Sequence, residues 1–305
     1  MLHASVATPR GRAVWAFLAP VARSWRRSLA VGVSPGRSKE GKVERKNLRS
    51  GLLATLRQAR RRPDVESALG SLGPLLDVKE FSMAITAWGR AREPQRALAL
   101  LEEMKSRSVE PDVISFSAAI SACGAGGQWE RALELLEEMR MRGVEPDAIS
   151  FSAAISACEQ RGEAATANIV YSEAVALKLL PRMHNGKIDL HALSAPVARV
   201  AVAWSLECLA RGEIPLPDNE LVIVTGKGRH SEGNVAVIKP QIEAMLSSAE
   251  FAGLDAIEDA RNTGVLVVRG PNLRAWVAAR SRDWAFWWVA WGFARGLKAL
   301  FSSGR

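Results

Sequence analysis

Cysteine is scarce in this 305-residue sequence, and its three cysteines form no recognisable framework. Cys123, Cys158 and Cys208 lie too far apart for the Cys-x-x-Cys pairs that mark many zinc and redox sites. The sequence therefore does not predict a disulfide-stabilised secreted domain, and it is compatible with a reducing compartment. No cofactor is predicted with certainty. Cys123 and Cys158 are 35 residues apart. We expect both to fill small packing slots between helices.

Acidic residues are missing from the start of the chain, where Glu40 is the first. Residues 1–62 hold 15 Lys+Arg against 2 Asp+Glu, a net of +13, which leaves −4 for the rest of a chain with net charge +9. The apolar run 13–22 is interrupted by Pro20 and is shorter than the roughly 20 residues of a transmembrane helix. It would suit a signal-peptide core. An Arg-rich, acid-free start is typical of an organellar transit peptide, which we predict for residues 1–39. The destination is then a mitochondrion or a plastid. The alternative is a basic arm that docks on RNA.

An internal repeat of 35 residues dominates what is present. The segment 109–123, VEPDVISFSAAISAC, returns almost unchanged at 144–158, and Phe81, Phe116 and Phe151 are spaced by the same 35 residues. A fixed period of about 20–50 residues indicates an array of stacked supersecondary units. We therefore expect repeats over residues 78–182. Residues 40–77 are either a linker or a degenerate helical repeat.

Each repeat is predicted to be a pair of helices. In the middle unit Phe116, Ala119, Ile120 and Cys123 fall at i, i+3, i+4 and i+7, which is one apolar stripe at helical period. A Gly-rich turn at 124–127 follows, and then a second amphipathic segment. One such hairpin cannot bury its stripe alone, so about three of them are expected to stack as a short solenoid.

The period of 35 and the closing Val-Glu-Pro-Asp make this region similar to pentatricopeptide repeats. The rival is the 34-residue tetratricopeptide repeat, which also stacks helix hairpins but binds protein. The resemblance implies a solenoid that binds single-stranded RNA at one base per repeat. It also implies that the base is read by the residue after the first-helix aromatic, together with the last residue of the unit. The pairs are Ser82 with Asp112, Ser117 with Asp147, and Ser152 with Arg182.

The resemblance implies a preference for purines, most of all guanine, at the first two pairs. A carboxylate accepts hydrogen bonds from the N–H edge of guanine. Arg182 departs from the pattern and leaves the third base undefined. The simpler alternative for Asp112 and Asp147 is helix capping after Pro. For Ile114 and Ile149 the alternatives are wedging between bases, which the resemblance implies, and plain helix packing.

Residues 187–268 change character, alternating as β-α-β-α-β-β in a compact α/β sandwich. The run 188–192 reads IDLHA, and 225–231 reads TGKGRHS directly after the apolar strand 221–224. These two motifs resemble those of the Smr (small MutS-related) domain, in which the first reads Leu-Asp-Leu-His-Gly. The fold class expected is therefore α+β, with an all-α solenoid followed by an Smr-like domain. Ala192 replaces the family glycine and would be strained if the position needs positive φ.

The Smr-like segment carries the residues that phosphodiester cleavage needs. Asp189 and His191 alternate on a strand and so share one side, where His191 is a candidate acid or base. Asp189 would orient the imidazole, act as base or hold a divalent ion such as Mg²⁺ or Mn²⁺. Without the second motif, the pair reads as one that satisfies local backbone groups. The turn is predicted to cradle phosphate through backbone N–H groups and basic side chains. Its residues are Thr225, Gly226, Lys227, Gly228, Arg229 and His230.

The tail, residues 269–305, crowds tryptophan and arginine: Trp276, Trp284, Trp287, Trp288 and Trp291 lie in it. Membrane contact, packing on the domain and stacking on RNA are all open.

Two functions follow for the whole chain. The first is an organellar endoribonuclease in which repeats position single-stranded RNA and the Smr-like domain cuts it. The second is a non-catalytic adaptor that protects or presents transcripts. Three repeats specify only about three bases, so other RNA-processing proteins or unseen degenerate repeats are expected to help.

Overall fold

The computed structural model describes residues 39–217, 220–227 and 236–280. The predicted transit segment and most of the Trp-rich tail lie outside these residues. The chain divides into two compact units between Gly126 and Gly127. In the described residues no helix is long and apolar enough to cross a bilayer.

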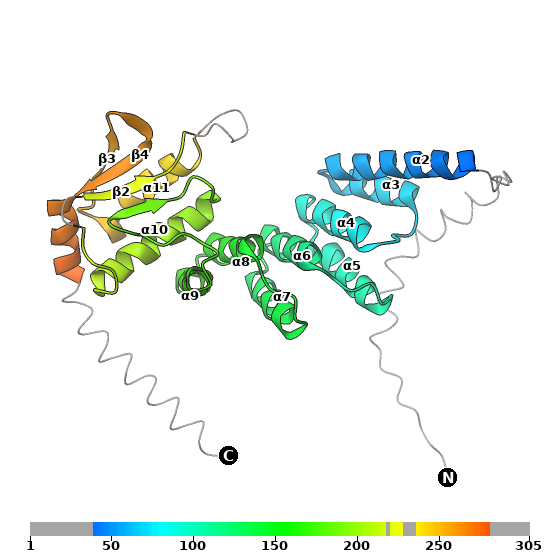
Figure 1. Cartoon of the computed structure of the whole chain (residues 1–305), viewed down its shortest axis with the longest axis horizontal. Coiled ribbons are helices and arrows are strands. Elements are labelled where there is room, and N and C mark those ends of the chain that lie inside the picture. The colour runs from blue at the N-terminus through cyan, green and yellow to red at the C-terminus, as the bar shows by residue number, and fades with distance from the viewer. Residues whose placement is uncertain (1–38, 218–219, 228–235, 281–305) are drawn as a thin grey trace, which may run out of the picture. The chain divides into compact units, whose positions relative to one another are not determined.

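Helices make up the described part of the first unit (Figure 1). In order they are α2 (Lys39–Gln58), α3 (Arg62–Leu72), α4 (Val78–Arg90), α5 (Pro94–Ser106) and α6 (Val113–Ala125). The second unit begins with α7 (Trp129–Met141), α8 (Ala148–Gln160) and α9 (Ala164–Ala176). Two helices per 35-residue period is the predicted pattern, and the structure confirms it.

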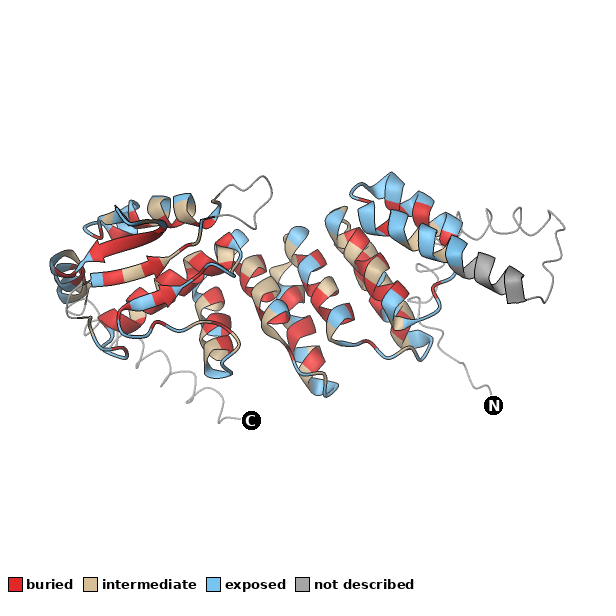
Figure 2. Cartoon of the chain, turned by 45° about the horizontal axis from the view of Figure 1, so that its top comes forward, coloured by how far each residue is buried: buried red, intermediate tan, exposed pale blue. Residues whose placement is uncertain are grey.

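The same local chemistry starts the first helix of each repeat. Asp77, Asp112 and Asp147 are extended residues, spaced by 35, that each accept a hydrogen bond from the backbone N–H three residues later, at 2.8–2.9 Å. An N-cap of this kind satisfies one of the donors left unpaired at a helix start. The apolar stripes then pack inward: Phe81, Phe116, Phe151, Cys123 and Cys158 are completely buried. Figure 2 shows buried residues along the repeat helices, with intermediate and exposed residues between them.

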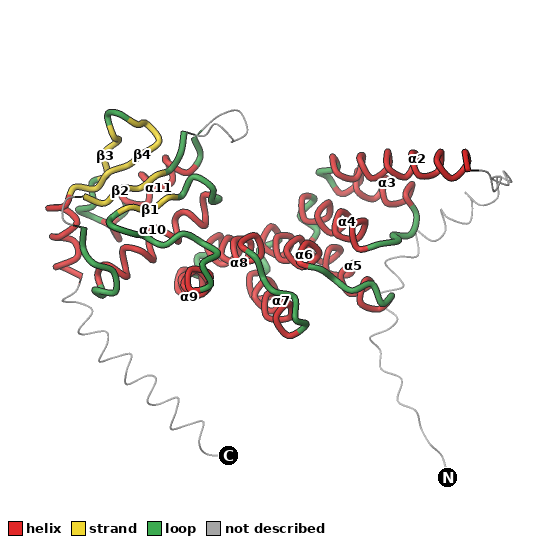
Figure 3. The backbone as a smooth tube through the Cα atoms, viewed as in Figure 1, coloured by secondary structure: helices red, strands yellow, loops and turns green. Residues whose placement is uncertain are grey.

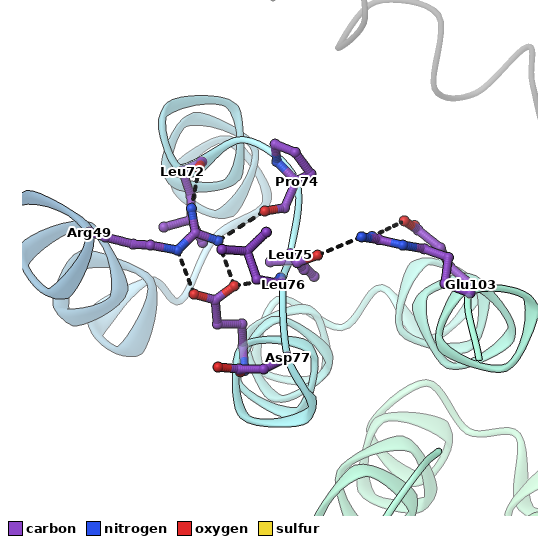
Figure 4. Close-up of polar contacts among 9 residues, drawn as sticks. Arg49, Leu72, Pro74, Leu75, Leu76, Asp77 and Glu103 are labelled. Atoms are coloured by element: carbon purple, nitrogen blue, oxygen red, sulfur yellow. Dashed lines mark hydrogen bonds and ion pairs between the residues drawn. The ribbon is translucent and has the colours of Figure 1, made fainter. Parts of the chain in front are cut away.

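Residues 40–77 contain a helix pair, α2 and α3, which is bonded to α4. Arg49 on α2 makes two hydrogen bonds to the Glu80 carboxylate on α4 at 2.5 and 2.6 Å, and it donates to the carbonyls of Leu72 and Pro74 at 3.2 and 2.9 Å (Figure 4). The side chain of Glu80 is 6 % exposed. The pair therefore links α2, the end of α3 and the start of α4, so these helices are held to the first of the predicted repeats.

The rest of the second unit is a small mixed sheet with helices (Figure 3). Its elements are β1 (Lys187–Asp189), α10 (Ala195–Ala210), β2 (Glu220–Val224), α11 (Ile238–Leu246), the short 3₁₀ helix η2 (Ala249–Phe251), β3 (Ala256–Asp259) and β4 (Asn262–Arg269). The strand order is β1-β2-β4-β3, with β1 parallel to β2 and the other pairs antiparallel.

The order of elements matches the expected β-α-β-α-β-β, with two differences. The second helix of the expected order is divided into α11 and η2. Residues 270–280, expected to belong to the tail, form a helix directly after β4. Its Trp276 is buried and stacks on Phe251, with ring centroids 6.1 Å apart. For Trp276, packing on the domain is therefore the correct alternative of the three.

Helix α10 contacts the repeats as well as the α/β region. It packs against α8 and α9, and against α11. Arg199 of α10 pairs with Glu159 of α8, Asn168 of α9 donates to Glu207 at 3.1 Å, and the Tyr171 and Trp204 rings lie 5.5 Å apart. Helix α10 thus joins the third repeat to the α/β region through polar and aromatic contacts. The boundary expected between residues 182 and 187 falls inside one compact unit.

Candidate nucleic-acid interface and strand-end site

The capping aspartates keep one carboxylate oxygen out of the cap. Oδ1 of Asp112 accepts the backbone N–H of Ser115 at 2.8 Å and the Ser115 hydroxyl at 2.7 Å. Asp147 repeats this with Ser150, at 2.8 Å for both bonds. Helix capping, the simpler alternative, is therefore present. It uses Oδ1 alone, so it does not exclude a second partner at Oδ2.

The predicted reading serines are largely buried and are bonded within their own helices. Ser82 is 5 % exposed and Ser117 6 % exposed. Each hydroxyl donates to the carbonyl four residues earlier, Val78 at 2.7 Å and Val113 at 2.6 Å. Such back-bonding is common for serine inside helices. Ser152 is half-buried, and Arg182, its predicted partner, is exposed.

The isoleucines near the start of the first helix in two repeats lie outside the repeat core. Ile114 and Ile149 are each 65 % exposed, which is unusual for a large aliphatic side chain in two successive units. Both directly follow the first residue of their helix. The packing alternative is therefore wrong for these two residues, and an apolar contact with an external partner stays as the prediction.

At the carboxyl end of β1, Asp189 and His191 lie on one side of the strand, as expected. Asp189 Oδ1 and His191 Nδ1 are 2.7 Å apart, and the His191 backbone N–H donates to the same oxygen at 3.2 Å. Partial burial raises the pKa of Asp189, but the hydrogen bonds from His191 outweigh it and hold that pKa below its ordinary value. With Nδ1–H held by a carboxylate, the neutral ring presents Nε2 as an acceptor.

The two Smr-like motifs meet in space because their strands are neighbours. Asp189 pairs with Val224, the last residue of β2, so the turn that begins at Thr225 starts beside the strand end. Gly226 has φ of +78°, and a Cβ added to it would lie 3.1 Å from Cβ of His191. Glycine is therefore needed both for the backbone conformation and for the close approach.

Gly264 on β4 completes this contact, and the sequence did not point to it. A Cβ on Gly264 would lie 2.9 Å from the carbonyl carbon of Gly226 and 3.1 Å from Cγ of Lys227. An isolated glycine inside an apolar strand signals close backbone approach, which was the available clue.

The expected phosphate cradle requires a correction. The backbone N–H groups of Thr225 and Gly226 both donate to the Gly264 carbonyl, at 2.9 and 3.0 Å, and the Thr225 hydroxyl donates to it at 3.1 Å. Donors already engaged inside the protein cannot also bind phosphate without breaking these bonds. Thr225 and Gly226 are therefore structural. Lys227 is exposed, whereas Gly228, Arg229 and His230 lie outside the described residues.

Two further expectations are answered at this strand end. Ala192 is not among the described residues with positive φ, so an alanine at this position causes no backbone strain. Within the described ranges, no group of three or more His, Cys, Asp or Glu side chains is arranged to hold a metal ion. A Mg²⁺ or Mn²⁺ ion on Asp189 would have to draw its remaining ligands from water and RNA phosphate.

The buried thiols are unsuited to chemistry. Burial raises the pKa of Cys158 to about 11 and that of Cys208 to about 12. Since the thiolate is the reactive form, both cysteines are inert at neutral pH, in agreement with a packing role.

Comparison with known proteins identifies the repeats. A family model described as pentatricopeptide repeat domain matches residues 72–126, and one described as PPR repeat family matches residues 118–160. Neither model extends into the α/β region. No curated protein matches the chain.

Solved structures of a pentatricopeptide repeat protein, PPR10, are also similar. The crystal structure of PPR10 from maize matches at 21 % identity and a TM-score of 0.45, covering 65 % of this chain and 29 % of that chain. PPR10 in complex with an 18-nt psaJ RNA element matches at 22 % identity and a TM-score of 0.41. That match covers 68 % of this chain and 32 % of that chain. The chain thus spans about a third of the length of these proteins. The family models identify residues 72–160 of this chain as pentatricopeptide repeats.

Proposed function

We propose that the repeats bind single-stranded RNA. The observation that carries the proposal is the recurrence, 35 residues apart, of an exposed isoleucine two residues after a capping aspartate: Ile114 after Asp112, and Ile149 after Asp147. An exposed apolar side chain beside a carboxylate offers a base both a stacking surface and a hydrogen-bond acceptor. Pentatricopeptide repeats use one base per repeat, and PPR10 has been solved with bound RNA.

The second part of the proposal is that the α/β region acts on the bound strand as an Smr-like endoribonuclease. It rests on Asp189, His191 and Lys227, which come together at the ends of β1 and β2. Asp189 holds Nδ1 of His191, so Nε2 accepts the proton of an attacking ribose hydroxyl or water. The same nitrogen, once protonated, donates to the leaving oxygen. Lys227 supplies positive charge for the phosphate.

A specific observation favours the adaptor as the second candidate. The amides of Thr225 and Gly226 are already engaged by the Gly264 carbonyl, which leaves fewer donors for a phosphate in the transition state. A site with Asp189 and His191 but without this support would bind a strand and leave it intact.

The chain is further proposed to work in an organelle, a mitochondrion or a plastid, to which residues 1–39 direct it. Other RNA-processing proteins are proposed partners, because a few repeats address few bases. Membrane contact by the tail beyond residue 280 is a separate proposal. Fusion of residues 1–39 to a fluorescent protein tests the address directly, since diffuse fluorescence would refute it.

Cleavage is tested with Asp189→Ala and His191→Ala in the full chain on labelled single-stranded RNA. Both variants should lose cleavage, while RNA affinity stays within a few-fold, because acid–base groups act mainly in the transition state. Lys178→Ala, an exposed cation at the end of the third repeat, is the matched control. Wild-type cleavage by both site variants would remove the nuclease assignment. Binding without cleavage by the unaltered chain would favour the adaptor.

A further inference from the structure

Three oxygen atoms link the predicted reading residues Ser82 and Asp112. The Ser115 hydroxyl is 2.7 Å from Oδ1 of Asp112 and 2.9 Å from the Ser82 hydroxyl. The Ser82 hydroxyl is in turn 2.7 Å from the Val78 carbonyl. All four residues belong to the first compact unit. Ser115 itself is completely buried, so it cannot touch a base.

These contacts compete for protons. Two hydroxyl groups hold two protons, whereas three oxygen–oxygen contacts would each need one. The carboxylate of Asp112 only accepts, and a hydrogen bond to a charged group is stronger than one between neutral groups. The Ser115 proton therefore goes to Asp112. The Ser82 proton then goes to Ser115 or to the Val78 carbonyl, and Ser82 meets any further partner with lone pairs.

We infer that Ser115 is a positioning residue that holds Ser82 and Asp112 as two hydrogen-bond acceptors, and so sets a preference for guanine. This inference rests on the proposed RNA binding. The pairing edge of guanine carries two adjacent donors, the ring N–H and the amino group. Adenine and cytosine each combine a donor with a ring acceptor, which two fixed acceptors repel. Buried polar groups left unpaired by the wrong base add to this discrimination.

The other repeats support this role for the position. Ser150, 35 residues after Ser115, is also completely buried and bonds Asp147 in the same way. Glu80, 35 residues before Ser115, is different, because its carboxylate is held by Arg49. Asp77 accepts only the backbone N–H of Glu80 in its cap. The hydroxyl link is thus a property of particular repeats and does not follow from capping.

The test is the variant Ser115→Ala in the full chain. The cap survives, because the Ser115 backbone N–H still bonds Asp112, and Ser82 keeps the Val78 carbonyl. Without the Ser115 hydroxyl, Oδ1 of Asp112 loses one of its two donors and Ser82 loses its link to Asp112, so the two acceptors are no longer held together. The preference for guanine over adenine at one base should fall about five- to tenfold, while total affinity changes less. Ser121→Ala, an exposed serine on the same helix, is the matched control.

The probe is a short oligouridine strand. Each of the four bases is placed in turn at two successive positions of this strand, and the relative affinities are measured by competition. Ser115→Ala should change the ranking at one position and leave its neighbour unaltered, a pattern that general destabilisation does not produce. If the unaltered chain prefers guanine and Ser115→Ala keeps that preference, the inference fails and the proposed RNA binding stands. If the unaltered chain binds no strand, both fail.

A second variant keeps the inference testable if thermal unfolding finds Ser115→Ala misfolded. Asn is as good a helix cap as Asp, so Asp112→Asn should fold. The side-chain amide of the introduced asparagine can donate a hydrogen bond. The Ser115 hydroxyl then no longer faces a charged acceptor. The ranking at that base should move from guanine towards adenine. An unchanged ranking would overturn the inference.

Discussion

At the scale of single residues, capping and base reading are compatible because a carboxylate has two oxygens. Asp112 and Asp147 each use Oδ1 for the helix start, through a backbone N–H and a serine hydroxyl. A substitution that keeps the cap but alters the second oxygen therefore separates the two roles. Asparagine is the natural choice, because its side-chain amide keeps one acceptor oxygen and replaces the other with an NH2 donor.

For Asp147→Asn we predict a change of base preference without a change of stability. The unfolding free energy should shift by less than about 0.5 kcal/mol, because Asn and Asp cap equally well. Discrimination at one base should shift by roughly 1–3 kcal/mol, away from guanine and towards adenine. Competition across the four bases gives the second quantity and denaturant unfolding the first.

Asp147→Ala is the contrasting variant, which should lose about 1 kcal/mol of stability with the cap. If Asp147→Asn leaves the base ranking intact, Asp147 is a cap alone, and the repeats contribute only shape and stacking.

At the scale of elements, one ion pair fixes the first helical hairpin. Arg49 joins α2 to α4 and to the end of α3, and Glu80 accepts from Arg49 and from the Leu76 backbone N–H at 2.7 Å. The hydrogen bond from Arg49 lowers the pKa of Glu80; burial opposes this shift, and the Leu76 bond adds to it. A nearly buried carboxylate that lost Arg49 would keep its charge without a partner, which is costly.

We therefore predict that Arg49→Ala opens the α2–α3 hairpin. The local free energy of opening should fall by about 3 kcal/mol, at the lower end for breaking a buried pair, because Arg49 is partly exposed. Hydrogen exchange of the amides in α2 and α3 measures it. Arg60→Ala, an exposed arginine in the same segment, should have no comparable effect.

The same pair predicts a pH dependence. Since the folded-state pKa of Glu80 is lowered, its contribution is present above the ordinary glutamate pKa and is lost as pH falls through the lower folded value. Protection of α2 and α3 should thus decline on acidification in the unaltered chain and much less in Arg49→Ala. Parallel acid profiles for the two would argue against the ion pair as the cause.

At the scale of the whole molecule, the α/β region closes the repeat stack of the second unit. Helix α10 is buried against α8 and α9, and its Arg199 pairs with Glu159. A terminal repeat needs a cover for its apolar face. In this chain the cover comes from the domain that follows.

A chain ending after residue 182 should therefore have a loosened third repeat. We predict that hydrogen exchange in α8 and α9 accelerates by at least about tenfold and that protease cleaves there first, since apolar surface is uncovered. A chain ending after residue 280 keeps α10 and serves as the control. Equal protection of α8 and α9 in both shortened chains would mean that α10 is dispensable for the repeat.

Sequence reasoning succeeded where a pattern repeats. The period of 35, the two helices per unit and the strand-end meeting of Asp189 with His191 all follow from spacing and alternation. It could not decide residues 40–77. Gln58 ends α2, and Arg90 ends α4, only 32 residues later, so the first hairpin falls out of the 35-residue register. The ion pair of Arg49 with Glu80, which also joins this hairpin to α4, is not signalled by any apolar periodicity.

Other features depend on three-dimensional contacts that no spacing encodes. The engagement of the Thr225 and Gly226 amides by Gly264 requires β4 to lie beside β2, although the two are far apart in sequence. The link from Ser82 to Ser115 crosses between two helices of successive repeats. The apolar face of α10 could be read from its sequence, but not that α8 and α9 are among its partners.

The shared helix also sets an order of events during synthesis. The helices of the third repeat end at Ala176, yet the covering helix α10 ends 34 residues later, at Ala210. At about 5–20 residues per second, a ribosome needs roughly 2–7 s to make that stretch. For that interval the nascent chain carries an uncovered apolar face, where chaperones bind. The last repeat therefore reaches its final fold only after the α/β region that follows it in the sequence has begun to emerge from the ribosome.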